Sequence, residues 1–234
     1  MSHSMEDRMV YRKAVPKRMA RKRGRTAPKS LLGFVLLLCL GLGVVLLGLY
    51  LKQAPKIENP RVAQLAQVKL PSWIDEQIIP KRSDSRRGVY LEDITGIVIH
   101  YVGNPGTTAQ QNRNYFANPG TEVNSHFLVG LDGEIIQCLP LEEKSSASNE
   151  RNRDTISIEV CHATEDGAFS DRSYEALLRL TAWLCEVTQL DETAVIRHYD
   201  VTGKACPLYY VEHQEAWDQF KLDIKDSMEA KKAP

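Results

Sequence analysis

Three residues of types that bind transition metals stand out in the chain. His100 ends a run of β-branched residues, and His198 is followed eight residues later by Cys206. Zinc binds imidazole nitrogen and thiolate sulfur, and a catalytic zinc site uses three protein ligands so that a fourth position stays open for water. Two histidines and one cysteine fit that count. Each also has an ordinary alternative, because a histidine at a strand end is often structural and a lone cysteine is often a small buried hydrophobe.

A glutamate is the next candidate for chemistry. Side chains alternate along a strand, so Glu159 points away from its apolar neighbours Ile158 and Val160, as His100 points away from Ile99. We therefore expect Glu159 to share a sheet face with a metal ligand. A carboxylate inside an apolar strand is costly to bury without a partner, which favours a functional role over a structural one.

The elements that position these residues follow from the hydrophobic pattern. Runs rich in β-branched residues predict strands, and Asp132-Gly133 is a strong turn signal between two of them. Apolar residues at spacings of three and four predict helices. Strands separated by helices indicate an α/β domain of about 145 residues, large enough to hold its own core. The predicted strands are residues 94–101, 123–131, 134–139, 155–161 and 194–198, and the predicted helices are residues 107–116, 171–189 and 211–225.

Four segments together resemble a known family. They read ITGIVIHY from residue 94, SHFLVGLDGEIIQ from residue 125, RDTISIEVCH from residue 153 and RHYDVTGKACP from residue 197. In this order and spacing they are similar to the zinc-dependent N-acetylmuramoyl-L-alanine amidases of type 2, relatives of phage lysozyme-like amidases and peptidoglycan recognition proteins. The resemblance covers residues 89–222, and its last segment is the most specific.

The resemblance implies a fold, a metal and a reaction. The fold is a mixed central β-sheet flanked by helices, with one Zn²⁺ in a surface groove. The reaction is hydrolysis, by zinc-activated water, of the amide that joins the lactyl group of N-acetylmuramic acid to L-alanine in peptidoglycan. The family's ligand positions fall on His100, His198 and Cys206.

The resemblance also assigns catalytic roles. The glutamate that matches Glu159 activates the attacking water, and the lysine that matches Lys204 stabilises the developing oxyanion. The chain departs from many members of the superfamily at Ser125, where they have a catalytic tyrosine. Because serine cannot replace a phenol, we expect Glu159 to carry the catalytic role instead. The alternative for Lys204 is an ordinary surface lysine in a loop.

Three further polar residues are expected near the groove. His126 is expected to line it or to support a ligand, with a structural role as the alternative. Asn104, in a turn after His100, is expected to form part of the groove wall. Asp200 is expected to orient the loop that holds His198 and Cys206.

An uncharged run precedes the domain. Residues 31–51 carry no charged side chain, and about 21 residues form a helix about 31 Å long, which is enough to span a bilayer. The run is longer than the core of a signal peptide and lacks a small-x-small cleavage site. Basic residues are denser before the run than after it. We therefore expect one transmembrane helix in the cell membrane, with residues 1–30 as a cytoplasmic tail and the domain outside.

Charge is polarised along the chain. Residues 1–30 carry ten basic and two acidic side chains, so the rest of this formally neutral chain has a net charge of −8. An acidic body argues against nucleic-acid binding, and five cysteines without C-x-x-C pairs exclude a zinc ribbon or a dense disulfide scaffold. Prolines and charges predict a stalk over residues 52–88, followed by an amidase domain over residues 89–226 and a tail over residues 227–234.

The leading hypothesis is therefore a monomeric, membrane-anchored peptidoglycan amidase, with peptidoglycan and the lipid bilayer as its partners. The alternatives are a recognition module of the same fold, which binds muropeptide without cutting it, and a degenerate structural anchor. Loss of the third ligand is typical of the first, but Cys206 is present. Loss of Glu159 or Lys204 is expected of the second, and both are retained.

Overall fold

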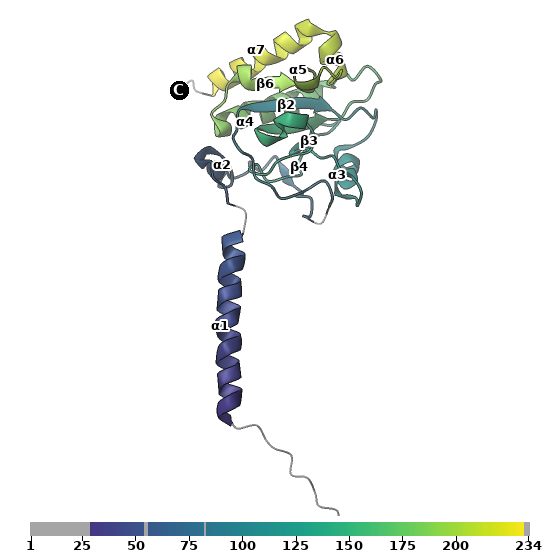
Figure 1. The fold of residues 1–234 in the computed structure, drawn as a ribbon. Coiled ribbons are helices and arrows are strands. Elements are labelled where there is room, and N and C mark those ends of the chain that lie inside the picture. The colour runs from purple at the N-terminus through teal and green to yellow at the C-terminus, as the bar shows by residue number, and fades with distance from the viewer. Residues whose placement is uncertain (1–28, 54–55, 82, 232–234) are drawn as a thin grey trace, which may run out of the picture. The chain divides into compact units, whose positions relative to one another are not determined.

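The chain divides into two units. The computed structural model describes residues 29–53, 56–81 and 83–231, so most of the predicted basic tail lies outside the described residues (Figure 1). One unit covers residues 1–54 and the other residues 55–234. The first contains a single described helix, α1 (Lys29–Gln53), which includes the predicted transmembrane run. Within the described part of the chain, no helix combines the length and the apolar character needed to cross a membrane.

The second unit is built on one six-stranded sheet with the order β1-β4-β3-β5-β2-β6. Its centre is parallel, because β5 pairs in parallel with both β2 and β3, and β2 pairs in parallel with β6. The hairpin β3–β4 is antiparallel, and Gly133 in its turn has a φ of +83°, as the Asp132-Gly133 signal predicts. The strands are β1 (Asp75–Glu76), β2 (Gly96–Tyr101), β3 (Phe127–Val129), β4 (Ile135–Gln137), β5 (Thr155–Val160) and β6 (Val195–Arg197).

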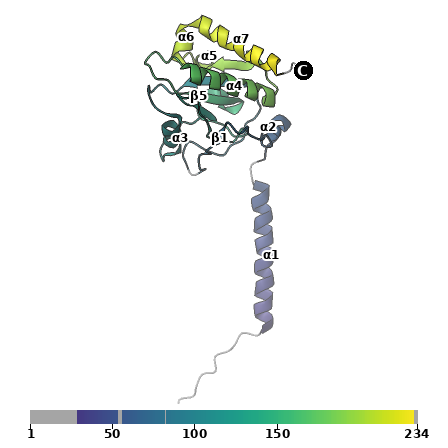
Figure 2. The same cartoon turned by 180° about the vertical axis from the view of Figure 1, so that it is seen from behind.

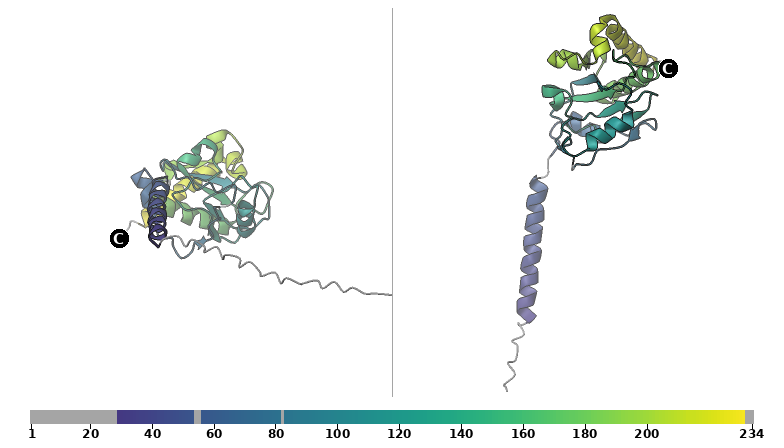
Figure 3. Two further views of the ribbon diagram at one scale, coloured as in Figure 1. Left: turned by 60° about the horizontal axis from the view of Figure 1, so that its bottom comes forward. Right: turned by 90° about the vertical axis from the view of Figure 1, so that its right-hand side faces the viewer.

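Helices cover both faces of this sheet. On one face, α2 (Pro60–Leu65), α4 (Asp171–Thr188) and α7 (Gln214–Ala230) pack against β2, β3 and β5. Figure 2 shows α4 in front of the sheet, and Figure 3 follows the layers from two further sides. On the other face, α3 (Ala109–Ala117) packs against Leu128 and Ile136. The mixed α/β sheet flanked by helices is therefore confirmed.

The alternation expected for the central strands is also confirmed. Ile97 and Ile99 of β2 and Ile158 of β5 lie in the core under α4 and α7. His100 and Glu159 consequently point to the opposite face. The predicted C-terminal helix is instead two helices, α6 (Leu208–Glu212) and α7, separated by the non-helical backbone of His213. Because α7 continues to Ala230, most of the described part of the predicted tail is helical.

The predicted stalk is wrong for most of its length. Val62, Ile74 and Ile79 are buried in the hydrophobic cores of the domain. The strand β1 joins the sheet edge beside β4, and the buried guanidinium of Arg86 makes a two-pronged ion pair with Glu143 at 2.7 and 2.8 Å. The segment from residue 59 to residue 88 is thus a strap that belongs to the domain.

Candidate active site

The three candidate ligands lie together at one end of the sheet. His100 lies near the carboxyl end of β2, His198 directly follows β6 in α5 (His198–Thr202), and Cys206 follows α5. All three are buried, and one donor atom from each lies within 4.8 Å of the others. The Cys206 sulfur is 3.9 Å from Nδ1 of His100. The carboxyl ends of adjacent parallel strands are the usual place for a binding crevice in an open α/β sheet.

Backbone contacts hold the loop that carries two of these residues. The amide of Tyr199 donates to the carbonyl of Cys206 at 2.9 Å, which closes the loop. Asp200 accepts from the backbone amide of Arg197 at 2.8 Å and from its guanidinium at 2.8 and 3.2 Å. The carboxylate thus fixes the start of α5, where His198 lies. Burial raises the pKa of Asp200, but the Arg197 hydrogen bonds and charge lower it overall.

Burial favours the neutral form of both histidines. It lowers the pKa of His100 well below its usual value, and the charges of His198 and Lys204 lower it further. Burial and Lys204 likewise lower the pKa of His198. Burial, followed by the charge of Glu159, raises the pKa of the Cys206 thiol to about 12. The imidazoles therefore offer free lone pairs, whereas the thiol needs a nearby cation to ionise.

The ring nitrogens of the two histidines have distinct surroundings. Nε2 of His100 is 3.0 Å from the Ser148 hydroxyl, and Nε2 of His198 is 3.0 Å from the Asn149 side-chain oxygen. Nδ1 of His198 is buried and has no hydrogen-bond partner among the described residues. Sequence reasoning missed Ser148 and Asn149, because no motif marks a contact that forms only when a loop folds over the sheet.

Glu159 lies beside the ligands. It pairs in register with His100 across β5 and β2, and one of its carboxylate oxygens is buried without a hydrogen-bond partner among the described residues. Burial raises the pKa of Glu159 to about 8, although Lys204 opposes this shift. A carboxyl with a raised pKa and a nearby cation is a candidate for proton transfer.

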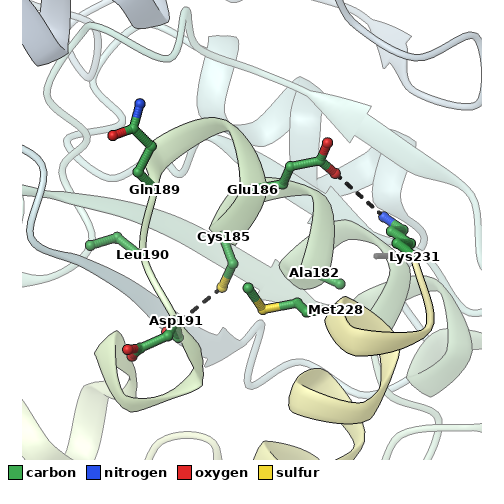
Figure 4. Close-up of a pocket in the computed structure, with 8 residues that line it drawn as sticks. All are labelled: Ala182, Cys185, Glu186, Gln189, Leu190, Asp191, Met228 and Lys231. Carbon is green, nitrogen blue, oxygen red and sulfur yellow. Dashed lines mark hydrogen bonds and ion pairs between the residues drawn. The ribbon is translucent and has the colours of Figure 1, made fainter. Parts of the chain in front are cut away.

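A groove of about 500 Å³ surrounds these groups, and Glu159, Lys204 and the three ligands all line it. The helix α3 contributes Tyr115 and Phe116 to its wall. An adjoining lobe of about 670 Å³ shares Ser146, His198 and Lys204 with the groove. The cavity in Figure 4, about 400 Å³ between α4 and the end of α7, has no lining residue in common with it.

Two predicted groove residues lie elsewhere. His126 is fully buried and does not line the groove. Its Nδ1 accepts from the amide of Ser157 at 3.0 Å and its Nε2 donates to the carbonyl of Glu143 at 2.8 Å, so its role is structural. Asn104 lies in an exposed turn, and its neighbour Gly103 lines the groove instead.

The chain is similar in sequence to several bacterial proteins. The family model described as N-acetylmuramoyl-L-alanine amidase matches residues 90–208. The N-acetylmuramoyl-L-alanine amidase BlyA of Bacillus subtilis (strain 168) is 29% identical over 174 residues, which cover 65% of this chain and 47% of that protein. CwlL of Bacillus licheniformis is 28% identical over 157 residues, which cover 60% of this chain and 43% of that protein. The chain spans less than half the length of these relatives.

Solved structures share the fold. The catalytic domain of XlyA is 30% identical with a TM-score of 0.57, and the match covers 64% of this chain and 98% of that domain. The PlyG catalytic domain is 22% identical with a TM-score of 0.59 over 69% of this chain and 98% of that domain, a likeness of fold alone. The family match includes His100, Glu159, His198, Lys204 and Cys206 and extends over half of the chain. The chain therefore belongs to the N-acetylmuramoyl-L-alanine amidase family.

Proposed function

We propose that this protein hydrolyses the amide between N-acetylmuramic acid and L-alanine in peptidoglycan, with one zinc ion bound by His100, His198 and Cys206. The observation that carries the proposal is the convergence of these donors with Glu159 and Lys204 in one groove. The choice of this amide as the bond that is hydrolysed follows the names of the relatives.

The residues present fit a zinc ion. Two neutral imidazoles and a cysteine are the nitrogen and sulfur donors that zinc prefers, and three protein ligands leave a position for water. Nδ1 of His198 is buried without a hydrogen-bond partner among the described residues, which is costly unless another atom occupies its lone pair. A cation there would also stabilise the thiolate of Cys206.

Glu159 and Lys204 have separate roles in the proposed reaction. Zinc, when bound, supplies Lewis-acid polarisation and lowers the pKa of the attacking water. Glu159 takes a proton from that water and delivers it to the leaving amine, since its carboxylate lies in register with His100. The charge of Lys204 opposes the burial that raises the pKa of Glu159 to about 8, and so favours the carboxylate that a base requires. Lys204 places a positive charge in the groove, where it stabilises the developing oxyanion.

The proposal is tested with the purified full chain and peptidoglycan. Mass spectrometry should identify newly freed N-terminal alanine, and elemental analysis should find close to one zinc per chain. Cys206→Ser should lower both sharply, because a hydroxyl is a much poorer zinc ligand than a thiolate. Binding of muropeptide without any release of alanine would identify a recognition module instead, and full zinc retention in Cys206→Ser would exclude Cys206 as a ligand.

We also propose that the whole uncharged run, residues 31–51, anchors the protein in the cell membrane with the amidase domain outside. The described residues contain no helix long and apolar enough to span a membrane, so the proposal rests on the sequence of the whole run. The support is the uncharged run over residues 31–51 and the dense basic tail before it. Described apolar side chains such as Phe34, Leu37 and Val44 are exposed on this helix. An apolar helix surface of this kind requires a lipid or protein environment.

A further inference from the structure

Two consecutive loop residues contact the two histidine ligands. Ser148 faces Nε2 of His100 at 3.0 Å, and Asn149 faces Nε2 of His198 at 3.0 Å. The other ring nitrogen of His100, Nδ1, is 3.9 Å from the Cys206 sulfur. Nδ1 of His198 has no hydrogen-bond partner among the described residues. One short turn therefore contacts both imidazoles through their Nε2 atoms.

We propose that Ser148 and Asn149 are positioning residues that hold both imidazoles as the Nε2–H tautomer, with their Nδ1 lone pairs directed at one metal ion. The side-chain oxygen of Asn149 is only an acceptor, so the ring of His198 must donate to it through Nε2–H. Nδ1 is then the unprotonated nitrogen. A serine hydroxyl can either donate or accept, and here the position of the other nitrogen decides: Nδ1 of His100 faces the Cys206 sulfur at 3.9 Å, so Ser148 accepts from Nε2–H. This inference rests on the proposed metal site.

The turn is held firmly enough to serve this purpose. The side-chain oxygen of Asn152 accepts from the amide of Ser148 at 2.7 Å and from the amide of Ala147 at 2.9 Å. The amide of Arg151 donates to the carbonyl of Ser148 at 3.0 Å. Ser148 itself is fully buried. These contacts fix the backbone of Ser148 before any metal binds, and fixed partners in the outer shell usually tune metal affinity.

The backbone of Asn149 supports a specific role for its side chain. Its φ of +52° lies in the left-handed region, which glycine adopts most easily and asparagine tolerates. A residue chosen for the backbone alone would be glycine, whereas asparagine adds the acceptor that His198 meets. This geometry also gives a clean variant, because Asn149→Gly removes the side chain without straining the backbone.

The same segment carries the proposed general base. The short 3₁₀ helix Asn149–Arg153 leads within two residues into β5, on which Glu159 lies beside His100. The stretch from residue 148 to residue 159 therefore orients both histidine ligands and places the carboxylate. A shift of this stretch would move the ligands and the base together.

The test measures metal affinity in the full chain. Ser148→Ala and Asn149→Gly each remove one acceptor, and Asn149→Asp keeps an oxygen at the same place. Ser145→Ala is the matched control, since Ser145 is a buried serine of the same loop whose hydroxyl meets Asn152 at 3.4 Å and no histidine. Affinities for Zn²⁺ and Co²⁺ are measured by competition with a chelator, and thermal unfolding of the metal-free proteins confirms that each variant is folded.

Ser148→Ala and Asn149→Gly should each weaken metal binding by about 10–100-fold, the usual effect of losing an outer partner of a ligand. Asn149→Asp and Ser145→Ala should stay within about threefold of the wild type. The cobalt absorption bands should shift in the two weakened variants, since the ligand geometry around the metal changes. Their thiolate-to-cobalt band should remain, because Cys206 is untouched.

A second measurement reads the tautomers directly. In the metal-free protein, ¹⁵N chemical shifts should give the Nε2–H form for His198, and Asn149→Gly should convert it to a mixture of tautomers. Folded Ser148→Ala and Asn149→Gly proteins that bind metal as tightly as the wild type, with unchanged tautomers, would overturn the inference. A wild-type chain that binds no metal would instead overturn the proposed function, so the two failures are distinguishable.

Discussion

At the residue scale, Glu159 combines a cost in folding with a use in chemistry. It lies in a strand whose neighbouring residues are apolar, and burial raises the pKa of its carboxyl to about 8. Ionising it therefore opposes folding of the metal-free protein above its unfolded pKa of about 4.5. A positively charged partner would offset the cost of burying the ionised carboxylate. The groove places Glu159 beside the candidate ligands and Lys204.

We therefore expect Glu159→Gln to separate chemistry from stability. Glutamine keeps the shape but accepts no proton, so the amidase rate should fall about 10²–10⁴-fold, or about 3–5 kcal/mol in the barrier, while zinc content persists. The metal-free variant should melt at the same temperature as the wild type or higher near pH 8. Glu165→Gln, on an exposed loop, is the control and should change neither property. An unchanged turnover with zinc bound would assign the base to another group.

His126, in contrast to Glu159, has a structural role. Its effect is expected in the pH dependence of the free energy of unfolding. Burial lowers its pKa to about 4, although the hydrogen bond to the Glu143 carbonyl opposes the shift. Between about pH 6.5 and pH 4 the unfolded chain binds a proton that the folded one excludes, so stability falls as the pH falls through this window.

The metal-free protein should accordingly lose about 2 kcal/mol of unfolding free energy at this site between pH 7 and pH 5. Urea titrations at the two pH values measure the loss. His126→Asn has no proton to bind in that range, so its stability should depend less on pH by about that amount. Equal pH dependence in the two proteins would mean that the buried, neutral state of His126 is not what the fold requires.

At the scale of elements, the sequence pattern predicts the strands, turns and helices that depend on neighbouring residues. The strands around His100 and Glu159, the hairpin at Gly133 and the helix α4 follow from alternation, turn chemistry and helical spacing. The strap over residues 59–88 does not, because prolines and charged residues interrupt its apolar pattern. What fixes it is a set of distant contacts, which include the pair between Arg86 and Glu143, 57 positions apart. The contacts of Ser148 and Asn149 escape prediction for the same reason.

Breaking that pair should show whether the strap belongs to the fold in solution. Arg86→Ala leaves a buried carboxylate without its partner, which costs about 3–5 kcal/mol. Arg87→Ala is the matched control, because Arg87 is exposed and should change stability by about 0.5 kcal/mol or less. Chemical denaturation of the two variants and the wild type gives both values. A loss below about 1 kcal/mol in Arg86→Ala would mean that the strap contributes little to the folded domain.

At the scale of the whole molecule, charge and hydropathy divide the chain into parts with different surroundings. The first 30 residues carry a net charge of +8, an uncharged run follows, and the remaining residues are acidic overall. The substrate proposed above, peptidoglycan, is a cell-wall polymer. An amidase domain outside the membrane would meet that polymer directly, and a basic tail resists transfer across the membrane.

The proposed topology leads to the last prediction. A reporter that fluoresces only in the cytoplasm, fused after Pro234, should stay dark, because residues 52–234 would lie outside. Protease added to spheroplasts should remove the domain and leave a membrane-bound remnant. Replacing the basic residues of the tail with neutral ones should raise the fluorescence, since the charge asymmetry that orients the helix is then lost. A bright fusion of the unaltered chain would reverse the orientation, and a soluble product that begins near residue 52 would show cleavage instead of anchoring.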